Sequence, residues 1–393
     1  MKKRYVILTV TLFLITVSGA VNGQTIEEII EKHINAHGGL KNWQKIENMK
    51  ITGHFTSFSE RKPFTEIKAK GGKYYAHFWL GQHPVHEGSD GSFVWTDDPW
   101  FELPYARKAS PVEESVILQK ADFFTPFINY AEKGYKATFD GKEVKEGVEV
   151  FKITLTRNDG QNETWYLNSK TYLEYMAITD WSDFASPVQQ EAVFDDFRKV
   201  GEVVLPFYNE RVFDSRITST EIENIELNVA LEPGIFNLPL SEPMKKLDFL
   251  RGEWGVSFDA LGRGGNWSHV DSTSSVFQFI ENKNILQENI SYIRYLPLEK
   301  ITTWTFNNDR KNYLMTVFND IYSSTDVYQG DFQGDSLIMD NTLVSFTKTE
   351  NPTFTRYIFT QISQEGFVLE IAQSKDKGET WKVSQKFTYF RKK

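Results

Sequence analysis

Short runs in which apolar and polar residues alternate fill most of this sequence. Residues 50–58, 64–70 and 73–80 are such runs, and the third is rich in aromatic side chains. Gly71 and Gly72 lie between the last two runs and predict a turn there. Because the side chains of a strand point alternately to its two faces, a period of two predicts strands that bury one face. The pattern therefore predicts a mainly β protein.

Further alternating runs continue toward the C-terminus, with one clear interruption. They cover residues 135–139, 148–157, 163–168, 173–179, 190–200, 207–213 and 216–227. Residues 232–243 contain three prolines and no periodicity, which is typical of a linker. After a short helical segment at 244–250, regularly spaced short strands predict a closed barrel or a sandwich. Because about 370 residues exceed one ordinary core, we expect two domains, at 24–240 and 241–393.

A helix is expected at the start of the first domain. Thr25 stands three residues before Glu28, which is the spacing of a capping box. The isoleucines that follow recur with His33 at helical intervals along one face. Gly38 is a typical residue to end the helix, and a short second helix is expected at 40–46.

Another helical region is expected at 111–134. Pro111 followed by two glutamates is a favourable helix start, because proline fits the first turn and acidic side chains stabilise it. The region is unusually apolar, and Pro126 would break or kink it.

The N-terminus has the pattern of a secretory signal peptide. Residues 2–4 are basic, residues 5–17 are almost entirely apolar, and small residues follow as far as Gly23. The apolar run is shorter than the ~20 residues that a membrane-spanning helix needs. We therefore expect residues 1–23 to be removed, with cleavage after Gly23 preferred over cleavage after Ala20.

The amino-acid composition limits where the protein is expected to be located and what it is expected to bind. There is no cysteine, so neither a disulfide nor the lipid-bearing cysteine of a bacterial lipoprotein is available. The expected product is a periplasmic protein that is not a lipoprotein and does not insert stably into the membrane. The net charge is −9 and no segment is strongly basic, so nucleic acid is not an expected partner. Aromatic residues make up 15% of the chain, and such residues favour strands and line apolar pockets.

Residues 24–240 resemble LolA/LolB-type lipoprotein-carrier proteins, in particular the larger exported versions common in Bacteroidetes-like genomes. The resemblance rests on the opening Thr25-Ile-Glu-Glu-Ile-Ile-Glu-Lys-His-Ile-Asn-Ala-His-Gly-Gly39, on Ile46-Glu-Asn-Met-Lys-Ile-Thr-Gly53, on Asp90-Gly91 with Trp95 and Asp98-Pro99, and on Pro233-Gly-Ile-Phe-Asn-Leu-Pro239. It implies an incompletely closed antiparallel barrel wrapped around helices, which holds acyl chains or other apolar ligands between sheet and helices.

Residues 244–393 resemble a lipocalin-like domain family of undefined function. The resemblance rests on Leu247-Asp-Phe-Leu-Arg-Gly-Glu-Trp254, on Thr302-Thr-Trp304, on Ser374-Lys-Asp-Lys-Gly-Glu-Thr-Trp381 and on Phe387-Thr-Tyr-Phe-Arg391. It implies a calycin-type antiparallel β-barrel in which the Arg391 guanidinium packs on the Trp254 indole, a cation–π contact worth ~1 kcal/mol. Residues 374–380 are expected to form a hairpin loop that turns at Lys377-Gly378.

Two groups of histidines have spacings that could provide metal ligands. His77, His83 and His86 lie close together and could bind zinc, but no further spacing completes a ligand set, so structural or exposed roles are favoured. His33 and His37 are four residues apart on the expected first helix. That spacing can hold a metal, but the glutamate of an H-E-x-x-H motif is missing, so a position in or near the core is favoured.

The sequence contains no pattern typical of an enzyme active site. There is no Gly-x-Ser-x-Gly elbow, no catalytic cysteine and no phosphate-binding glycine loop. Gly88 and Gly141 are instead expected at turns between strands. The adjacent Asp195 and Asp196 would point to opposite faces of a strand and could not act together. We expect no catalytic residue, no metal and no cofactor.

The carrier resemblance suggests which residues contact a ligand. Aromatic side chains in the first domain could line a hollow between sheet and helices, although for any single residue a core position is favoured. The residues expected to contact the ligand are Trp79, Trp95, Trp100, Phe123, Phe124, Phe127 and Ile128.

These observations predict an exported periplasmic protein that binds an apolar small molecule or lipid, such as an acyl chain, without catalysis. Each buried methylene contributes about 0.8 kcal/mol, so such a site needs no specific polar groups. One alternative is a metal-dependent hydrolase that uses His77, His83 and His86. The other is a protein-interaction module that binds another envelope protein and no small ligand.

Overall fold

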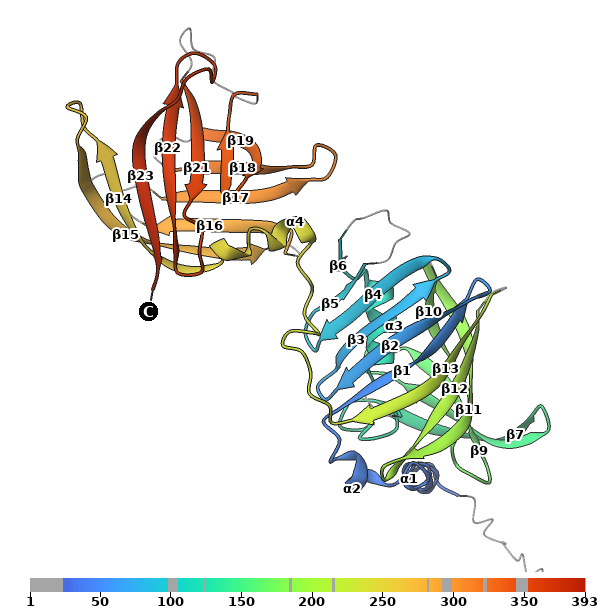
Figure 1. Cartoon of the computed structure of the whole chain (residues 1–393). Coiled ribbons are helices and arrows are strands. Elements are labelled where there is room, and N and C mark those ends of the chain that lie inside the picture. The colour runs from blue at the N-terminus through green and yellow to red at the C-terminus, as the bar shows by residue number, and fades with distance from the viewer. Residues whose placement is uncertain are drawn as a thin grey trace, which may run out of the picture. The chain divides into compact units, whose positions relative to one another are not determined.

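The computed structural model describes residues 24–97, 105–122, 125–183, 186–213, 216–280, 283–291, 299–320, 324–343 and 353–392. An open antiparallel sheet of 13 strands and a closed barrel of ten strands make up most of the structure (Figure 1). The predicted mainly β fold, with an incomplete first barrel and a closed second one, is confirmed. The predicted signal segment lies outside the described residues.

The two edge strands of the open sheet follow one another in the sequence and are joined by a helical segment. Its strands are β1 (Asn48–Ser57), β2 (Glu60–Ala69), β3 (Lys73–Leu80), β4 (His83–Asp90), β5 (Val94–Thr96), β6 (Arg107–Lys108), β7 (Lys136–Lys145), β8 (Val148–Thr156), β9 (Asn162–Asn168), β10 (Glu174–Asp183), β11 (Ser186–Val200), β12 (Val203–Phe213) and β13 (Arg216–Leu227). Their order is β6-β5-β4-β3-β2-β1-β13-β12-β11-β10-β9-β8-β7. The first and last strands in the sequence are therefore neighbours in the sheet, with Met49 opposite Leu227.

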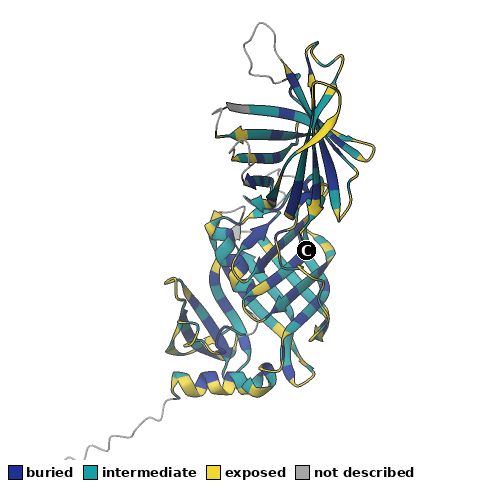
Figure 2. Ribbon diagram, turned by 90° about the vertical axis from the view of Figure 1, so that its left-hand side faces the viewer, coloured by how far each residue is buried: buried dark blue, intermediate teal, exposed yellow. Residues whose placement is uncertain are grey.

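The first helix, α1 (Ile26–Ala36), follows the sequence prediction closely. The Thr25 side chain accepts a hydrogen bond from the Glu28 backbone, and the Glu28 carboxylate accepts one from the Thr25 backbone, which forms the capping box. Gly38, at φ 100°, ends the helix, and the short α2 (Leu40–Trp43) follows. The buried residues of α1 recur every three or four positions, so one face packs on the sheet and the other is exposed, as the colours of Figure 2 show.

The helix α3 (Pro111–Ala121) covers only the first half of the predicted helical region. It begins with a second capping box, between Ser110 and Glu113, and with the predicted proline in its first turn. The described residues between Thr125 and Gly134 form turns instead. The helix therefore ends at Ala121, before the Pro126 that was expected to break or kink it.

Two glycines were misinterpreted as turn residues. Residues 87–90 form the second half of β4, and a Cβ on Gly88 would lie 2.6 Å from the Trp95 ring. This glycine therefore allows an indole to pack against the strand, which is a common reason for glycine inside a sheet. Gly141 lies at an irregularity within β7 rather than at the predicted turn, and the chain reverses later, at Gly147.

The barrel follows a short helical segment made of α4 (Glu242–Lys245) and the 3₁₀ helix η2 (Asp248–Leu250). Its strands are β14 (Gly252–Leu261), β15 (Trp267–Ile280), β16 (Ile285–Ser291), β17 (Lys300–Asn307), β18 (Asn312–Asn319), β19 (Ser324–Gln333), β20 (Ser336–Asp340), β21 (Phe354–Thr360), β22 (Gly366–Ser374) and β23 (Lys382–Arg391). One large apolar cluster fills it, with Trp254, Trp304 and Phe367 at most 2% exposed.

The predicted contact between the first and last barrel strands is confirmed. β14 pairs with β23, and Trp254 lies opposite Arg391. The centre of the Arg391 guanidinium is 3.8 Å from the centroid of the indole ring. Arg391 also donates hydrogen bonds to the backbone oxygens of Arg251 and Gln364, so it fixes the closure of the barrel.

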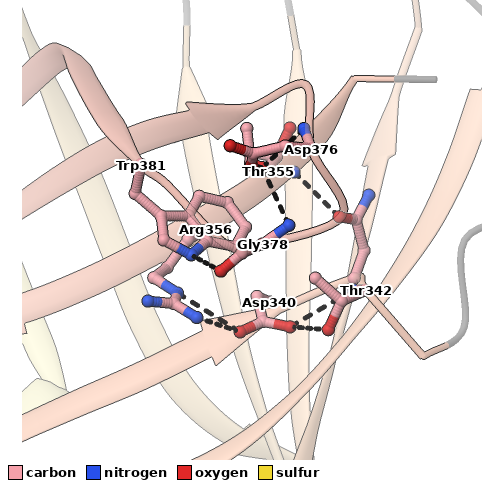
Figure 3. A network of polar contacts seen from close by, with 9 residues as sticks. Asp340, Thr342, Thr355, Arg356, Asp376, Gly378 and Trp381 are labelled. Carbon is pink, nitrogen blue, oxygen red and sulfur yellow. Dashed lines mark hydrogen bonds and ion pairs between the residues drawn. The ribbon is translucent and has the colours of Figure 1, made fainter. Parts of the chain in front are cut away.

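The predicted hairpin loop at 374–380 is also confirmed, and a polar network holds it (Figure 3). Lys377 and Gly378 take the positive φ values of 55° and 91° that the turn requires. The Trp381 indole donates to the Gly378 oxygen at 3.0 Å, and its ring lies 4.0 Å from the guanidinium of Arg356. Arg356 in turn pairs with Asp340 at 2.9 Å, which ties the loop to β20 and β21.

Grouped by proximity, the chain falls into two compact units. One takes the described residues of 1–45, 124–180 and 189–215, and the other takes those of 46–123, 181–188 and 216–393. Each unit includes strands of the open sheet, and the boundary expected at residue 240 stays a prediction. Among the helices of the described residues, none is long and apolar enough to span a bilayer.

Candidate functional site

The helix α3 lies on the concave side of the open sheet (Figure 1). It packs against β3, β4 and β5. The Lys120 ammonium forms an ion pair with Glu87 of β4 at 2.8 Å and lies 4.7 Å from the ring of Trp181 on β10. β4 and β10 are far apart in the strand order. One side chain can reach both because the sheet curls around the helix.

Apolar side chains surround this helix, and one apolar side chain of the helix itself is exposed. Ile117 and Ala121 of α3 pack with Tyr74 and Ala76 of β3 in one buried cluster. Only two of the helix's eleven residues are exposed, Pro111 and Leu118, whereas an ordinary surface helix exposes a whole polar face. Leu118 is 41% exposed, so an apolar side chain remains available on a helix that is otherwise enclosed.

Two of the predicted ligand residues, Trp79 and Trp95, lie on the face of the sheet that points away from α3. Trp95 packs with Leu238, and its indole donates to the Phe236 oxygen at 2.9 Å. Trp79 alternates along β3 with the residues that face the helix, so it shares the outer face with Tyr75. Trp95 is 1% exposed and Trp79 is half-buried.

Two other predicted residues, Phe127 and Ile128, are buried, and Phe127 lies in the core beneath α1. Phe127 is fully buried with Ile29 of α1 and Trp165 of β9, and Ile128 is 4% exposed. The structure therefore does not bring them together with Trp79 and Trp95. The remaining three, Trp100, Phe123 and Phe124, lie outside the described residues. A ligand-binding role for the seven residues stays a prediction.

The histidines of the alternative hydrolase are only partly brought together. His77 and His86 are opposite each other on β3 and β4, and their rings stack with centroids 4.4 Å apart. The His86 Nδ1 lies 2.7 Å from an Asp97 carboxylate oxygen. His83 is three residues before His86 on the same strand, so its side chain points to the opposite face.

A compact polar cluster lies at the C-terminal end of α1. His33 and His37 meet Glu174, the first residue of β10, and the three side chains are 0%, 2% and 7% exposed. The Nε2 atom of His37 is 2.7 Å from one Glu174 oxygen, and that of His33 is 3.6 Å from the other. The Nδ1 atoms lie 2.7 Å from the backbone oxygens of Tyr172 and Val204. Both imidazoles therefore turn Nε2 toward the same carboxylate.

The charges in this cluster follow from its burial. Burial lowers the pKa of His33 to about 4, so this imidazole is neutral and its Nε2 accepts a hydrogen bond from the Thr125 hydroxyl at 2.8 Å. Burial also opposes charge on Glu174, yet the adjacent imidazoles lower its pKa to about 2. For His37, burial is outweighed by the Glu174 carboxylate, which raises the pKa of the imidazole. The Glu174 carboxylate therefore faces a neutral His33 imidazole and a His37 imidazole whose pKa it raises.

Sequence reasoning found the two histidines but not their partner. The spacing of His33 and His37 indicated a shared helix face, and a missing glutamate argued against a metal site. Glu174 lies 137 residues beyond His37 and is brought to it by the sheet. The only local signal was that a glutamate stands in a predicted strand of otherwise mostly apolar residues. This signal is weak.

The comparisons with known proteins include a family model that matches part of the chain. A family model described as a protein of unknown function, DUF1579, matches residues 241–391. That range is the segment expected to be lipocalin-like, and the closed barrel is its observed fold. A search of curated proteins gave no significant match.

Three solved structures illustrate what the fold is similar to. A DUF1329 family protein from Desulfovibrio piger and a LolA superfamily protein from Nitrosomonas europaea each share 11% identity and cover 55% of this chain and 98% of their own, with TM-scores of 0.37 and 0.36. Rv2717c from M. tuberculosis shares 12% identity over 39% of this chain and all of its own, with a TM-score of 0.30. At these values the likenesses say nothing about what this chain binds.

Proposed function

We propose that this protein binds an apolar ligand, such as an acyl chain or a lipid, against the exposed flank of α3 inside the curved sheet, and that it does so without catalysis. The observation that carries the proposal is the enclosure of α3 with Leu118 left exposed. An apolar side chain at such a position gains about 25 cal/mol for each Å² that a ligand removes from water.

The surroundings of α3 suit a long apolar chain. Phe55 of β1 and Phe78 of β3 meet edge to face with ring centroids 5.4 Å apart, and Phe78 packs against the α3 cluster. Two cations beside the helix are already paired, Lys120 with Glu87 and Arg107 with Glu113. Binding would therefore depend on apolar contact rather than on recognition of a charged group. Export to the periplasm belongs to the same proposal and is supported by the N-terminal pattern.

Binding can be measured with a dansyl-labelled undecanoic acid and competed with palmitate. Leu118→Glu places a charge at the proposed contact and should weaken binding at least about tenfold, which corresponds to about 1.4 kcal/mol. Val144→Glu is the matched control, because Val144 is an exposed apolar residue, 67% accessible, on edge strand β7. Equal affinities of the two variants, or no saturable binding by the unaltered chain, would reject the proposal.

The predicted envelope protein partner would be sought on the barrel. Val276, Ile301 and Phe318 are 40–43% exposed and lie in one cross-strand row on β15, β17 and β18, with Asn289 of β16 between the first two. Such a row is a common feature of interaction surfaces, but it is small. The apolar-ligand function is therefore the better supported one.

A further inference from the structure

The polar cluster under α1 contains the donor atoms of a metal site. One Nε2 atom from each of His33 and His37 and one carboxylate oxygen of Glu174 lie within 4.8 Å of one another. In the part of the chain that the structure describes, no other group of three or more histidine, cysteine, aspartate or glutamate side chains brings its possible ligand atoms this close together. All three come from the same compact unit and from two rigid elements, α1 and β10.

The outer contacts of the cluster orient both imidazoles for a metal. Backbone oxygens only accept hydrogen bonds, so the oxygens of Tyr172 and Val204 fix the proton of each ring on Nδ1. That leaves the lone pair of the His33 Nε2 directed into the cluster, and the same would hold for His37 once its second proton leaves. Metal-bound histidines almost always have such a partner on the other ring nitrogen.

We propose that His33, His37 and Glu174 bind one Zn²⁺ ion, with the Thr125 hydroxyl or a water molecule as the fourth ligand. Two imidazoles and one carboxylate are ligands that zinc prefers, whereas Mg²⁺ and Ca²⁺ prefer oxygen alone. Thr125 Oγ1 already lies 2.8 Å from the His33 Nε2. The site departs from the sequence expectation of no metal, and it does not depend on the proposed ligand function.

The distances in the cluster are close to those that zinc needs. Bonds of about 2.0–2.1 Å in tetrahedral geometry place ligand atoms about 3.3 Å apart. The His37 Nε2–Glu174 Oε2 distance of 2.7 Å and the His33 Nε2–Glu174 Oε1 distance of 3.6 Å lie on either side of that value, although they end on different oxygens of the carboxylate.

A bound Zn²⁺ ion would place a positive charge beside the buried Glu174 carboxylate, whose two oxygens already face the imidazoles of His33 and His37. Because the three ligands are almost fully enclosed, the ion would fasten α1 to β10 and would not act on a substrate.

The test is a zinc titration of the full chain after removal of metals with a chelator. We expect one zinc per chain by elemental analysis and a rise in Tm on zinc addition. His33→Gln and Glu174→Gln should each lose more affinity than the 10–100-fold typical of an outer-shell change. The matched control is His77→Gln with His86→Gln, which removes a histidine pair elsewhere and should leave affinity unchanged.

A spectroscopic measurement keeps the test decisive if a ligand variant fails to fold. Co²⁺ bound to the unaltered chain should show the intense visible absorption of four-coordinate cobalt. Absence of zinc binding, a weak six-coordinate cobalt spectrum, or unchanged zinc affinity in folded His33→Gln protein would each overturn the proposal and leave the cluster as a buried ion pair only.

Discussion

The interiors of the open sheet and of the barrel are filled in different ways. The barrel closes on itself, and its own aromatic side chains fill it, among them Trp254, Phe277 and Phe367. The open sheet receives helices instead, and it buries ion pairs such as Lys120–Glu87 and His37–Glu174. The barrel is filled mainly by its own strands, with Met244, Leu247 and Leu250 of the preceding helical segment in the same cluster, whereas an open sheet leaves space for inserted elements, and for a ligand or an ion beside them.

The largest expected effect tests whether the barrel is a solid core. Trp254→Ala should destabilise the barrel by about 3–5 kcal/mol, because a fully buried indole is lost together with its contact to Arg391. Denaturation followed by tryptophan fluorescence would measure it. Trp267→Ala, at a residue 45% exposed, should stay within about 0.5 kcal/mol, and equal effects of the two would contradict a filled barrel.

The next effect tests the buried charges of the open sheet. Lys120→Met leaves the Glu87 carboxylate buried without its cation and should cost about 3 kcal/mol in urea denaturation. Adding Glu87→Met should restore most of that loss, since two apolar residues replace the pair. If the double variant is as unstable as Lys120→Met alone, the ion pair is not what makes the single change costly.

A smaller effect distinguishes the barrel from the region of the open sheet by how the stability of each depends on pH. Burial raises the pKa of Tyr313, in the barrel, to about 12. Between pH 10 and 12 the unfolded chain loses a proton that the folded barrel keeps, so stability falls as the pH rises. His33 has the opposite behaviour in the metal-free protein, because its pKa of about 4 makes stability fall as the pH drops from 6.5 toward 4.

Tyr313→Phe and His33→Gln check this contrast in the presence of a chelator. Tyr313→Phe should flatten the alkaline loss only, and His33→Gln should flatten the acid loss only, both read from the free energy of unfolding against pH. Alkaline behaviour that is unchanged in Tyr313→Phe would show that other buried tyrosines dominate.

The smallest effect concerns the barrel's hairpin loop. Gly378→Ala forces a side chain into a φ of 91° and places its Cβ 3.0 Å from the Thr342 side chain. The expected cost is about 1 kcal/mol, measured as a lower Tm of the barrel. Gly264→Ala is the control, since its Cβ would meet nothing within 4 Å. A Tm unchanged by Gly378→Ala would mean that the network of Figure 3 adapts to the loop.

Local signals in the sequence predicted the local structure well. The capping box of Thr25 and Glu28 gave the start of α1, and alternation gave β3 and β13 with their observed bounds. Gly88 misled because its role is to admit the Trp95 ring, a contact that local sequence does not reveal. The helix at 111 ended earlier than its apolar content suggested, because the following residues pack as turns under α1.

The polar cluster could not be predicted for a related reason. The spacing of His33 and His37 was visible, but their carboxylate comes from β10 and depends on how the sheet folds. The Trp254–Arg391 contact spans an equal distance and was still predicted, because a family resemblance supplied it. Contacts distant in sequence therefore need either a relative or a structure.

Hydrogen–deuterium exchange of the full chain with and without palmitate tests the central contrast most directly. Slower exchange is predicted in residues 111–121 and in β3, where the ligand would cover the flank of α3, with the barrel strands unchanged. Protection of the barrel strands with no change around α3 would contradict the account.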